Sequence, residues 1–246
     1  MLNVENPPDM IVLIPAKNEE TALAFLLPRL LKRVKRVIVV DNGSEDQTTK
    51  VARNAGVQVI TENRPGYGSA CLAGLKYLAR QPNPPKYVCF FDGDGQSNVA
   101  DIDKVALPVL KNRTPYCQGS RMIDPQSRNN LAIIARVANR LFAKFLSMIW
   151  KQHLTDLGPL RVINWDLLSE LNMASVNYGW TIEMSTKILK MGGVPYLEVP
   201  VNWHPRTSGK SKISGNFNTA FKAGSIMILT LLRVLLFWKP GIKNVN

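Results

Sequence analysis

Short apolar runs alternate with segments of helical periodicity through the first part of the chain, and this alternation limits the possible folds more than any other feature. The runs are strand-sized and mostly rich in β-branched or aromatic residues, which is typical of buried strands. They occupy residues 11–14, 37–40, 57–60 and 87–91. The segments between them carry apolar residues at helical spacing and occupy residues 19–32, 46–55 and 69–80. Such alternation predicts an α/β fold, in which a mostly parallel sheet has helices on both faces.

Polar clusters directly follow three of the four runs. PAKNEE follows the first run, DNGSED the second and DGDGQ the fourth, at residues 15–20, 41–46 and 92–96. In open α/β sheets, ligands bind beyond the carboxyl ends of the strands. We therefore expect the three clusters to share one binding site at that edge of the sheet.

The third cluster carries two carboxylates, Asp92 and Asp94, separated by Gly93. At a strand-end turn both can face one cation, and Mg²⁺ or Mn²⁺ prefers oxygen ligands and bridges them to substrate phosphates. Gly93 and Gly95 allow a sharp turn and the close approach of a diphosphate. The sequence therefore predicts a Mg²⁺ or Mn²⁺ site at Asp92 and Asp94, with Gln96 as a neutral oxygen ligand. An Asp- and Gly-rich turn without a ligand is the alternative.

Two long apolar segments, residues 131–150 and 217–238, distinguish the second half of the chain. Cations interrupt both of them, among them Arg136, Lys144 and Arg233. A membrane span needs about 20 largely apolar residues, and charges at mid-bilayer are costly. A wide apolar face with basic residues suits a helix that lies in the membrane interface. We therefore expect two interfacial helices, and two core helices are the alternative.

The charge balance favours a polyanionic partner. The chain has 31 lysines and arginines against 18 aspartates and glutamates, a formal net charge of +13. Nucleic acid, an anionic membrane and phosphorylated substrates all suit such a charge. A nucleic-acid-binding module would combine basic residues interleaved with aromatics and a known docking motif, and the sequence has neither. We therefore expect an anionic membrane surface and phosphorylated substrates as partners, and no nucleic acid.

The cysteines and the N-terminal segment indicate a reducing compartment. Cys71, Cys89 and Cys117 lack the spacing of a zinc site and are interpreted as buried free thiols. The polar N-terminal segment contains no apolar signal core. With interfacial helices, this predicts a cytoplasmic protein that associates peripherally with the cytoplasmic face of a membrane.

Several motifs occur in an order that resembles a known enzyme family. IPAKNEE, VVDNGSEDQT, FDGDGQ and GSR resemble the donor-binding half of family 2 glycosyltransferases, which have the GT-A fold. DLGPLRV, YGWTIEM and RTSGKSKISG look like the branch that acts on dolichyl or polyprenyl phosphate, as in enzymes similar to dolichol-phosphate mannose synthase. The resemblance covers nearly the whole chain, and several ordered motifs are more specific than any one of them.

This resemblance implies an organisation and an activity. One GT-A catalytic domain would span residues 1–246, with a nucleotide-sugar-binding half at 10–122, an acceptor-binding half at 123–215 and an interfacial helix at 216–238. The activity would be that of an inverting, metal-dependent hexosyltransferase. It would transfer a hexose from a UDP- or GDP-hexose to polyprenyl or dolichyl phosphate at the membrane surface.

The resemblance also implies roles for individual residues. The nucleoside pocket would comprise Pro15, Ala16, Asn18 and Glu19, with Asp41 holding the base or ribose. The diphosphate and its metal would lie at Asp92, Gly93, Asp94 and Gln96. The acceptor phosphate would be held by Arg121, Arg136 and Arg206, helped by Lys210, Ser211 and Lys212. The candidate catalytic residues are accordingly Asp94, Arg121, Arg136, Arg206 and Lys212.

Physical chemistry agrees with the acceptor assignment. Arginine suits phosphate because its planar fork donates two hydrogen bonds at once; contact with anionic lipid is the alternative for each arginine. A lipid monophosphate is largely ionised near neutral pH, because the second pKa of a phosphate is about 6. A dedicated general base is therefore not required. Glu183 is interpreted either as a base or donor-positioning group or as a structural residue, and His153 and His204 as structural or loop residues.

Two departures from the family pattern bear on the nucleotide. Asn42 stands where many relatives have a second Asp, and Tyr67 stands where some have a basic residue. Neither affects the expected metal site. The rival interpretations are a family 2 transferase with a soluble or glycan acceptor, and a catalytically inactive relative with a scaffolding role. The intact acidic motif argues against the second.

Overall fold

The computed structural model describes residues 9–206 and 217–241, and its first half confirms the expected alternation of strands and helices. The elements of this half are β1 (Met10–Ala16), α1 (Glu20–Leu31), β2 (Arg36–Asp41), α2 (Thr48–Asn54), β3 (Gln58–Thr61), α3 (Tyr67–Ala79) and β4 (Tyr87–Phe90). The expected ends differ from these by at most two residues, because apolar periodicity marks buried stretches more sharply than their ends.

The second half adds three strands and six helices within the described residues. These are α4 (Asp101–Leu110), β5 (Tyr116–Ser120), α5 (Pro125–Asn129), α6 (Ile133–Trp150), β6 (Arg161–Asn164), α7 (Trp165–Leu171), α8 (Trp180–Met191), β7 (Leu197–Pro200) and α9 (Phe217–Phe237). The sequence patterns did not predict α4, α5, β5 or β6. The two strands are four or five residues long and include polar residues such as Gln118 and Arg161, so they lack the apolar run that marks β1.

The strands form one seven-stranded sheet in the order β3-β2-β1-β4-β6-β5-β7. The pairs of β1 with β2 and β4, of β2 with β3, and of β5 with β7 are parallel. Only β6 runs antiparallel to its neighbours β4 and β5. The sheet is therefore mostly parallel, as expected, and β6 joins the strands of the two halves into one sheet.

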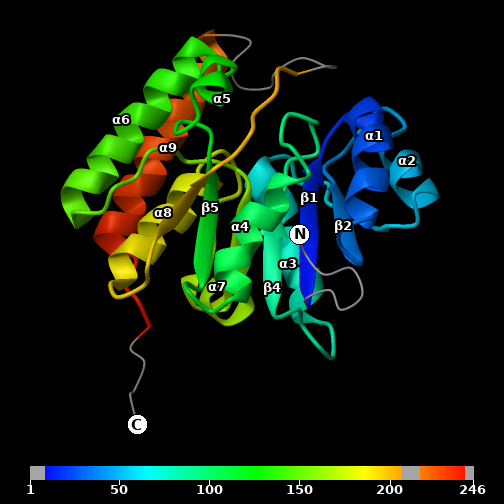
Figure 1. The fold of residues 1–246 in the computed structure, drawn as a ribbon, viewed down its shortest axis with the longest axis horizontal. Coiled ribbons are helices and arrows are strands. Elements are labelled where there is room, and N and C mark those ends of the chain that lie inside the picture. The colour runs from blue at the N-terminus through cyan, green and yellow to red at the C-terminus, as the bar shows by residue number, and fades with distance from the viewer. Residues whose placement is uncertain (1–8, 207–216, 242–246) are drawn as a thin grey trace.

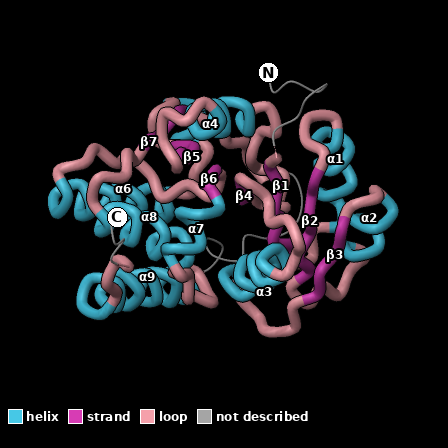
Figure 2. The backbone as a smooth tube through the Cα atoms, turned by 90° about the horizontal axis from the view of Figure 1, so that it is seen from below, coloured by secondary structure: helices cyan, strands magenta, loops and turns pink. Residues whose placement is uncertain are grey.

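Alternate residues of the strands enter two separate cores. Val12 and Ile14 of β1 pack with α1 and α4 on one face, where α2 also lies. Ile11 and Leu13 face the opposite way and pack with α3, α7 and α8. Figure 2 shows this arrangement, with α1, α2 and α4 on one side of the strands and α3 and α7 on the other. The fold is thus a three-layer α/β arrangement.

The two long helices, α6 and α9, pack beside α8 at the end of the molecule away from α1 and α2 (Figure 1). A third apolar cluster holds them there, with Leu146 of α6, Ile182 of α8 and Leu231 of α9 among its members. Each helix nevertheless leaves many large apolar side chains exposed. Among the described residues, no helix is both long enough and apolar enough to cross a bilayer.

Candidate active site

Hydrogen bonds connect the loops that follow β1 and β2, which contain the first two polar clusters. The backbone N–H of Asn18 donates to Ser44 Oγ at 2.9 Å, and the N–H of Glu45 donates to Asn18 Oδ1 at 2.8 Å. Asn18 adopts a left-handed conformation, with φ of 53°, that asparagine tolerates better than most residues. A third bond runs from the N–H of Glu19 to Thr48 Oγ1 at 2.8 Å. The two loops are therefore fixed relative to each other before any ligand binds.

Asp41 lies at the carboxyl end of β2, in register with Ala16 at the end of β1. Its carboxylate is buried, and Oδ1 has no hydrogen-bond partner among the described residues. Pro15, the neighbour of Ala16, is also buried in β1. The structure thus places Ala16 beside Asp41, whose carboxylate is buried, at the carboxyl ends of β1 and β2.

Asn42 binds the loop that leads from β3 to α3. Its Nδ2 donates to the carbonyls of Glu62 and Arg64 at 2.9 and 2.8 Å, and its Oδ1 accepts from the N–H of Gly66 at 2.8 Å. An aspartate could not donate to either carbonyl. The asparagine at this position is therefore explained by the loop that it holds.

The carboxylate pair lies in the turn after β4, as expected. Gly93 packs so closely that a Cβ there would lie 3.1 Å from Ile14 Cγ2, and Gly95 has a φ of +75° that favours glycine. Asp94 Oδ1 accepts from the N–H of Gln96 at 3.1 Å. Burial, reinforced by the charge of Asp94, raises the pKa of Asp92 to about 7. A site that holds two carboxylates at this cost is suited to a cation.

Gln96 connects this turn to the segment that follows β7. Its Nε2 donates to the carbonyl of His204 at 3.0 Å, and the N–H of His204 donates to the carbonyl of Gln96 at 2.9 Å. Ser97 and Trp203 form an isolated antiparallel bridge next to these bonds. The pairing explains how Arg206, only two residues beyond His204, reaches the carboxylates.

Arg206 forms ion pairs with the polar cluster after β1 and with the polar cluster after β4. Its Nη2 lies 2.8 Å from Asp94 Oδ2, and its Nη1 lies 3.4 Å from Glu19 Oε1. The side chain was expected at the acceptor phosphate, and here it contacts the expected metal ligand and the nucleoside-side Glu19. Lys210, Ser211 and Lys212 lie outside the described residues.

Arg121 is held by a buried carboxylate that the sequence analysis did not single out. Arg121 Nε and Nη2 donate to the two oxygens of Asp156 at 2.7 and 2.8 Å, and its backbone N–H donates to Oδ2 at 2.9 Å. Its guanidinium also lies over the ring of Trp203, 4.9 Å from the centroid. Burial by itself raises the pKa of Asp156, but the charge and hydrogen bonds of Arg121 outweigh it and hold that pKa below its ordinary value.

Arg136 lies apart from the other expected phosphate ligands. Its Nη2 donates to the carbonyls of Asn129 and Leu131, both at 3.3 Å, in the stretch that leads into α6. Its near neighbours Ile134, Ala135 and Ala138 line the cavity described next, whereas Arg136 does not. The helical rotation between these positions turns Arg136 towards the preceding loop.

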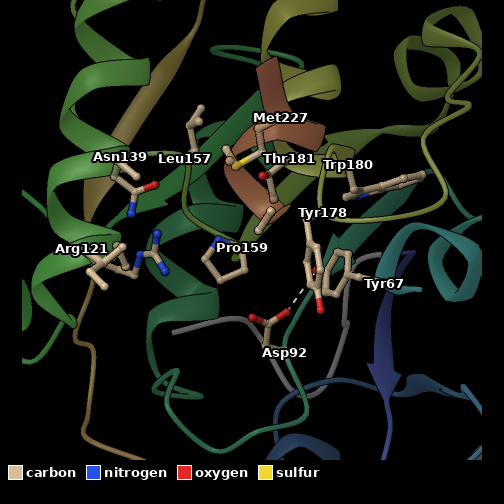
Figure 3. Close-up of a pocket in the computed structure, with 15 residues that line it drawn as sticks. Tyr67, Asp92, Arg121, Asn139, Leu157, Pro159, Tyr178, Trp180, Thr181 and Met227 are labelled. Atoms are coloured by element: carbon tan, nitrogen blue, oxygen red, sulfur yellow. Dashed lines mark hydrogen bonds between the residues drawn. The ribbon is translucent and has the colours of Figure 1, made fainter. Parts of the chain in front are cut away.

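A cavity of about 250 Å³ opens beside Asp92 (Figure 3). Its walls come from α6, α8, α9 and the segment before β6, and most of them are apolar. Asp92 and Arg121 bring charge to it, and Tyr67 lies against Asp92 with Tyr178 beside it. The other lining residues are Ile134, Ala135, Ala138, Asn139, Leu157, Pro159, Trp180, Thr181, Ala223, Gly224 and Met227. The arrangement can hold a charged group at one end and an apolar group along the helices.

Other residues of the later motifs support these walls. Arg161 is buried, and it donates to the carbonyls of Gly158 and Thr181 at 2.7 and 2.9 Å, so it joins the segment before β6 to the first turn of α8. Glu183 lies outside the cavity; it accepts from the N–H of Ser175 at 2.7 Å and pairs with Lys187 at 2.7 Å. These contacts fit the structural interpretation of Glu183.

The motif DLGPLRV could have identified Asp156 and Arg161, because it places an acidic and a basic residue in an otherwise apolar stretch.

The two histidines, which were interpreted as structural or loop residues, have no role in the cavity. His153 and His204 are exposed, and neither lines it.

Comparison with known proteins agrees with this geometry. Residues 11–164 match the family described as Glycosyl transferase family 2. An uncharacterised glycosyltransferase of Mycobacterium tuberculosis is 32% identical over 93% of this chain and 95% of its own length. A UDP-N-acetylglucosamine–dolichyl-phosphate N-acetylglucosaminyltransferase of Methanococcus voltae is 26% identical over 59% of this chain and 64% of its own.

The fold is also similar to solved structures. One is glucosyl-3-phosphoglycerate synthase of Mycobacterium tuberculosis in complex with Mn²⁺, UDP and phosphoglyceric acid, with a TM-score of 0.72 and 20% identity over 91% of this chain and 77% of that one. Residues 11–164, which match the family, include nearly all of β1, all of β2 and the carboxylate pair after β4. These are the elements that form the site at the strand ends. The chain therefore belongs to glycosyltransferase family 2, and its mostly parallel sheet flanked by helices is that of a GT-A fold.

Proposed function

We propose that this protein is an inverting hexosyltransferase that transfers a hexose from a UDP- or GDP-hexose to a polyprenyl or dolichyl phosphate at a membrane surface. The observation that carries the proposal is the cavity between α6, α8 and α9. It combines apolar walls with Asp92 and Arg121, so it suits a ligand with a phosphate head and a hydrocarbon tail. The dolichyl-phosphate transferase of Methanococcus voltae is a relative with such an acceptor.

The donor nucleotide is proposed to bind at the hydrogen-bonded loops after β1 and β2. Asp41 Oδ1 is a buried acceptor without a protein partner among the described residues, and base N–H or ribose O–H groups could donate to it. Pro15, Ala16, Asn18 and Glu19 surround this position or fix the loops beside it. The similar fold of glucosyl-3-phosphoglycerate synthase has been solved with UDP, which supports a nucleotide at this edge of the sheet.

The carboxylate pair fits a divalent cation. Asp92 and Asp94 offer the hard oxygen atoms that Mg²⁺ and Mn²⁺ prefer, Gln96 lies in the same turn, and Gly95 supplies the positive φ that the turn needs. When bound, the cation neutralises the charge that grows on the departing nucleoside diphosphate. The solved complexes of glucosyl-3-phosphoglycerate synthase with Mn²⁺ support this assignment.

Arg121 is proposed to orient the acceptor phosphate. Asp156 engages Nε and Nη2 of Arg121, so Nη1 on the other side of the guanidinium is the group available to a phosphate oxygen. That oxygen attacks the anomeric carbon, the bond from this carbon to the diphosphate breaks, and the configuration inverts. Asp156 does not serve as a base, because its ion pair with Arg121 lowers its pKa. The phosphate supplies its own negative charge near neutral pH.

The membrane surface is proposed to contact α6 and α9. Val137, Leu141 and Phe145 form an exposed apolar stripe on α6, and the cations Arg140 and Lys144 flank it. On α9 the exposed stripe comprises Phe221, Ile228, Leu229, Leu232 and Leu236, and Lys222 and Arg233 flank it. Apolar stripes flanked by cations match the interior and the anionic headgroups of a bilayer.

The rival is a soluble phosphorylated acceptor, such as the phosphoglyceric acid in the solved synthase complexes.

Substitutions that reduce the volume of the cavity distinguish the two acceptors. A Cβ on Gly224 of α9 would meet no atom within 4 Å, so Gly224→Ala is the matched control, and Gly224→Phe adds bulk at a residue that lines the cavity. We expect Gly224→Phe to lose transfer to polyprenyl phosphate, Gly224→Ala to keep it, and both to bind the donor nucleotide equally.

The assay supplies Mn²⁺, a panel of UDP- and GDP-hexoses, and either polyprenyl phosphate or 3-phosphoglycerate. Transfer to polyprenyl phosphate that Gly224→Phe abolishes supports the proposal. Efficient transfer to 3-phosphoglycerate by the unmodified protein, unaffected by Gly224→Phe, supports the rival.

A further inference from the structure

Tyr67 links the carboxylate pair to the cavity. Its phenol O–H donates to Asp92 Oδ1 at 3.0 Å, and its ring lines the cavity beside Tyr178 (Figure 3). It is the first residue of α3, in the sequence RPGYGSA. Tyr67 was not expected to affect the metal site, and its hydrogen bond to Asp92 shows that this expectation was wrong.

The backbone on both sides of Tyr67 packs closely against residues 175 and 176. A Cβ on Gly66 would lie 2.2 Å from the carbonyl oxygen of Val176, and a Cβ on Gly68 would lie 2.0 Å from that of Ser175. The N–H of Ser69 donates to the carbonyl of Val176 at 2.9 Å. The first turn of α3 is thus clamped against residues 175–176, and the glycines on either side of Tyr67 are required by this contact. The clamp fixes the point from which the phenol reaches Asp92.

A fixed phenol restricts how Asp92 can be used. One oxygen of the Asp92 carboxylate accepts from Tyr67, which leaves Oδ2 for a ligand. A phenol donates this bond without carrying a positive charge. A lysine or arginine there would also bind the carboxylate, but it would repel a cation at the same site.

We propose that Tyr67 is a positioning residue that orients Asp92 so that one carboxylate oxygen is presented to the divalent cation. The inference rests on the proposed metal site of the transferase. Hydrogen-bond partners of metal-ligating carboxylates typically contribute 10- to 100-fold to metal affinity, because they hold the ligand in its binding orientation. Tyr67→Phe keeps the ring in the cavity wall and removes only the donor. It is therefore expected to weaken Mn²⁺ binding by about 10- to 100-fold.

The experiment measures Mn²⁺ affinity directly, from the EPR signal of free Mn²⁺ during titration of the purified protein with and without UDP. Tyr178→Phe is the matched control, because it removes a second phenol from the same cavity and should leave Mn²⁺ affinity unchanged. Melting temperatures of the variants establish that they are folded. Saturating Mn²⁺ should restore the kcat of Tyr67→Phe to near that of the unmodified protein, whereas Asp92→Asn should not recover.

The outcomes are separable. Weaker Mn²⁺ binding by Tyr67→Phe, together with recovery at high Mn²⁺, supports the positioning role. Equal or tighter binding by a folded Tyr67→Phe overturns it while leaving the metal site intact. If the unmodified protein binds no Mn²⁺ with or without UDP, the proposed metal site itself is wrong. A lower kcat that high Mn²⁺ does not restore, with unchanged Mn²⁺ affinity, also contradicts the positioning role.

Discussion

Arg206 Nη2 donates to Asp94 Oδ2 at 2.8 Å, although 112 residues separate the two in the sequence. The same guanidinium reaches Glu19 Oε1, so one arginine from the second half of the chain spans the nucleoside side and the carboxylate pair. A cation at Asp94 and the guanidinium therefore compete for the same carboxylate. Metal binding is expected to release Arg206, which can then turn to an incoming phosphate.

Removing Arg206 should separate these two roles. We expect Arg206→Ala to bind Mn²⁺ more tightly than the unmodified protein when no nucleotide is present, because the competing charge is gone. Transfer should nevertheless slow by about 10- to 100-fold, since a hydrogen bond to a charged group contributes about 1.5–3 kcal/mol. Mn²⁺ titration and initial rates with polyprenyl phosphate measure the two effects. Arg33→Ala, which removes the cation of a distant pair with Asp103, is the control. Weaker Mn²⁺ binding by Arg206→Ala would contradict the competition.

Asp92 should make the metal-free protein less stable as the pH rises. Burial and the charge of Asp94 raise its pKa to about 7 in the folded protein, against about 3.9 in an unfolded chain. Between these values the folded state binds more protons than the unfolded state, so stability falls as the pH increases through that window. Asp92→Asn lacks this titration. Its melting temperature relative to the unmodified protein should therefore rise from pH 5 to pH 8 in EDTA.

With Mn²⁺ at pH 8, the unmodified protein should instead have the higher melting temperature of the two. The cation stabilises only the protein that keeps both carboxylates. Differential scanning fluorimetry at the two pH values, with EDTA or Mn²⁺, gives the comparison. A difference in melting temperature that stays constant from pH 5 to pH 8 would show that Asp92 is not strained by its surroundings.

Both members of the Arg121–Asp156 ion pair should be needed for stability and for transfer activity. Asp156→Asn leaves the Arg121 guanidinium buried without its counter-charge, which typically costs about 3–5 kcal/mol. The double variant Arg121→Gln, Asp156→Asn removes both charges and should recover part of that stability while remaining inactive in transfer. Urea unfolding measures the stability of both. Equal stability of Asp156→Asn and the unmodified protein would mean that Arg121 finds another partner or water.

The apolar face of α6 and α9 should bind anionic vesicles. Leu141 and Leu229 are 64% and 66% exposed, and replacing both by Gln removes two side chains that would enter the bilayer. Full burial of a leucine contributes about 1.5–3 kcal/mol, so the double variant should lose binding by at least about tenfold in vesicle sedimentation. Phe25→Gln on α1, where the side chain is 67% exposed, is the matched control. Unchanged vesicle binding, with a change in oligomeric state instead, would assign the face to a second copy of the chain.

Elements whose buried positions recur at a regular spacing could be predicted from the local sequence. The β-branched runs of β1 and β2, the apolar and aromatic run of β4 and the helical spacing of α1 and α3 indicate which positions are buried. The position of Asp92 and Asp94 at a strand end followed from the run before them, and the carboxyl-end rule then placed them with the loops after β1 and β2. The strands β5 and β6 lie inside the same sheet but were not predicted, because four or five residues that include Gln118 or Arg161 show no such repeat.

Contacts between side chains that are distant in the sequence could not be predicted in this way. Arg206 reaches Asp94 because Gln96 and His204 exchange hydrogen bonds, and nothing in either local sequence specifies that pairing. Arg136 has the same chemistry as Arg121, yet helical rotation directs it to the carbonyls of Asn129 and Leu131, whereas Asp156 holds Arg121 at the cavity. Local periodicity fixes which face of an element is buried, whereas contacts between distant charges depend on the path of the whole chain. Burial follows from each residue's position in its own element, whereas an ion pair needs two positions that come together only when the whole chain folds.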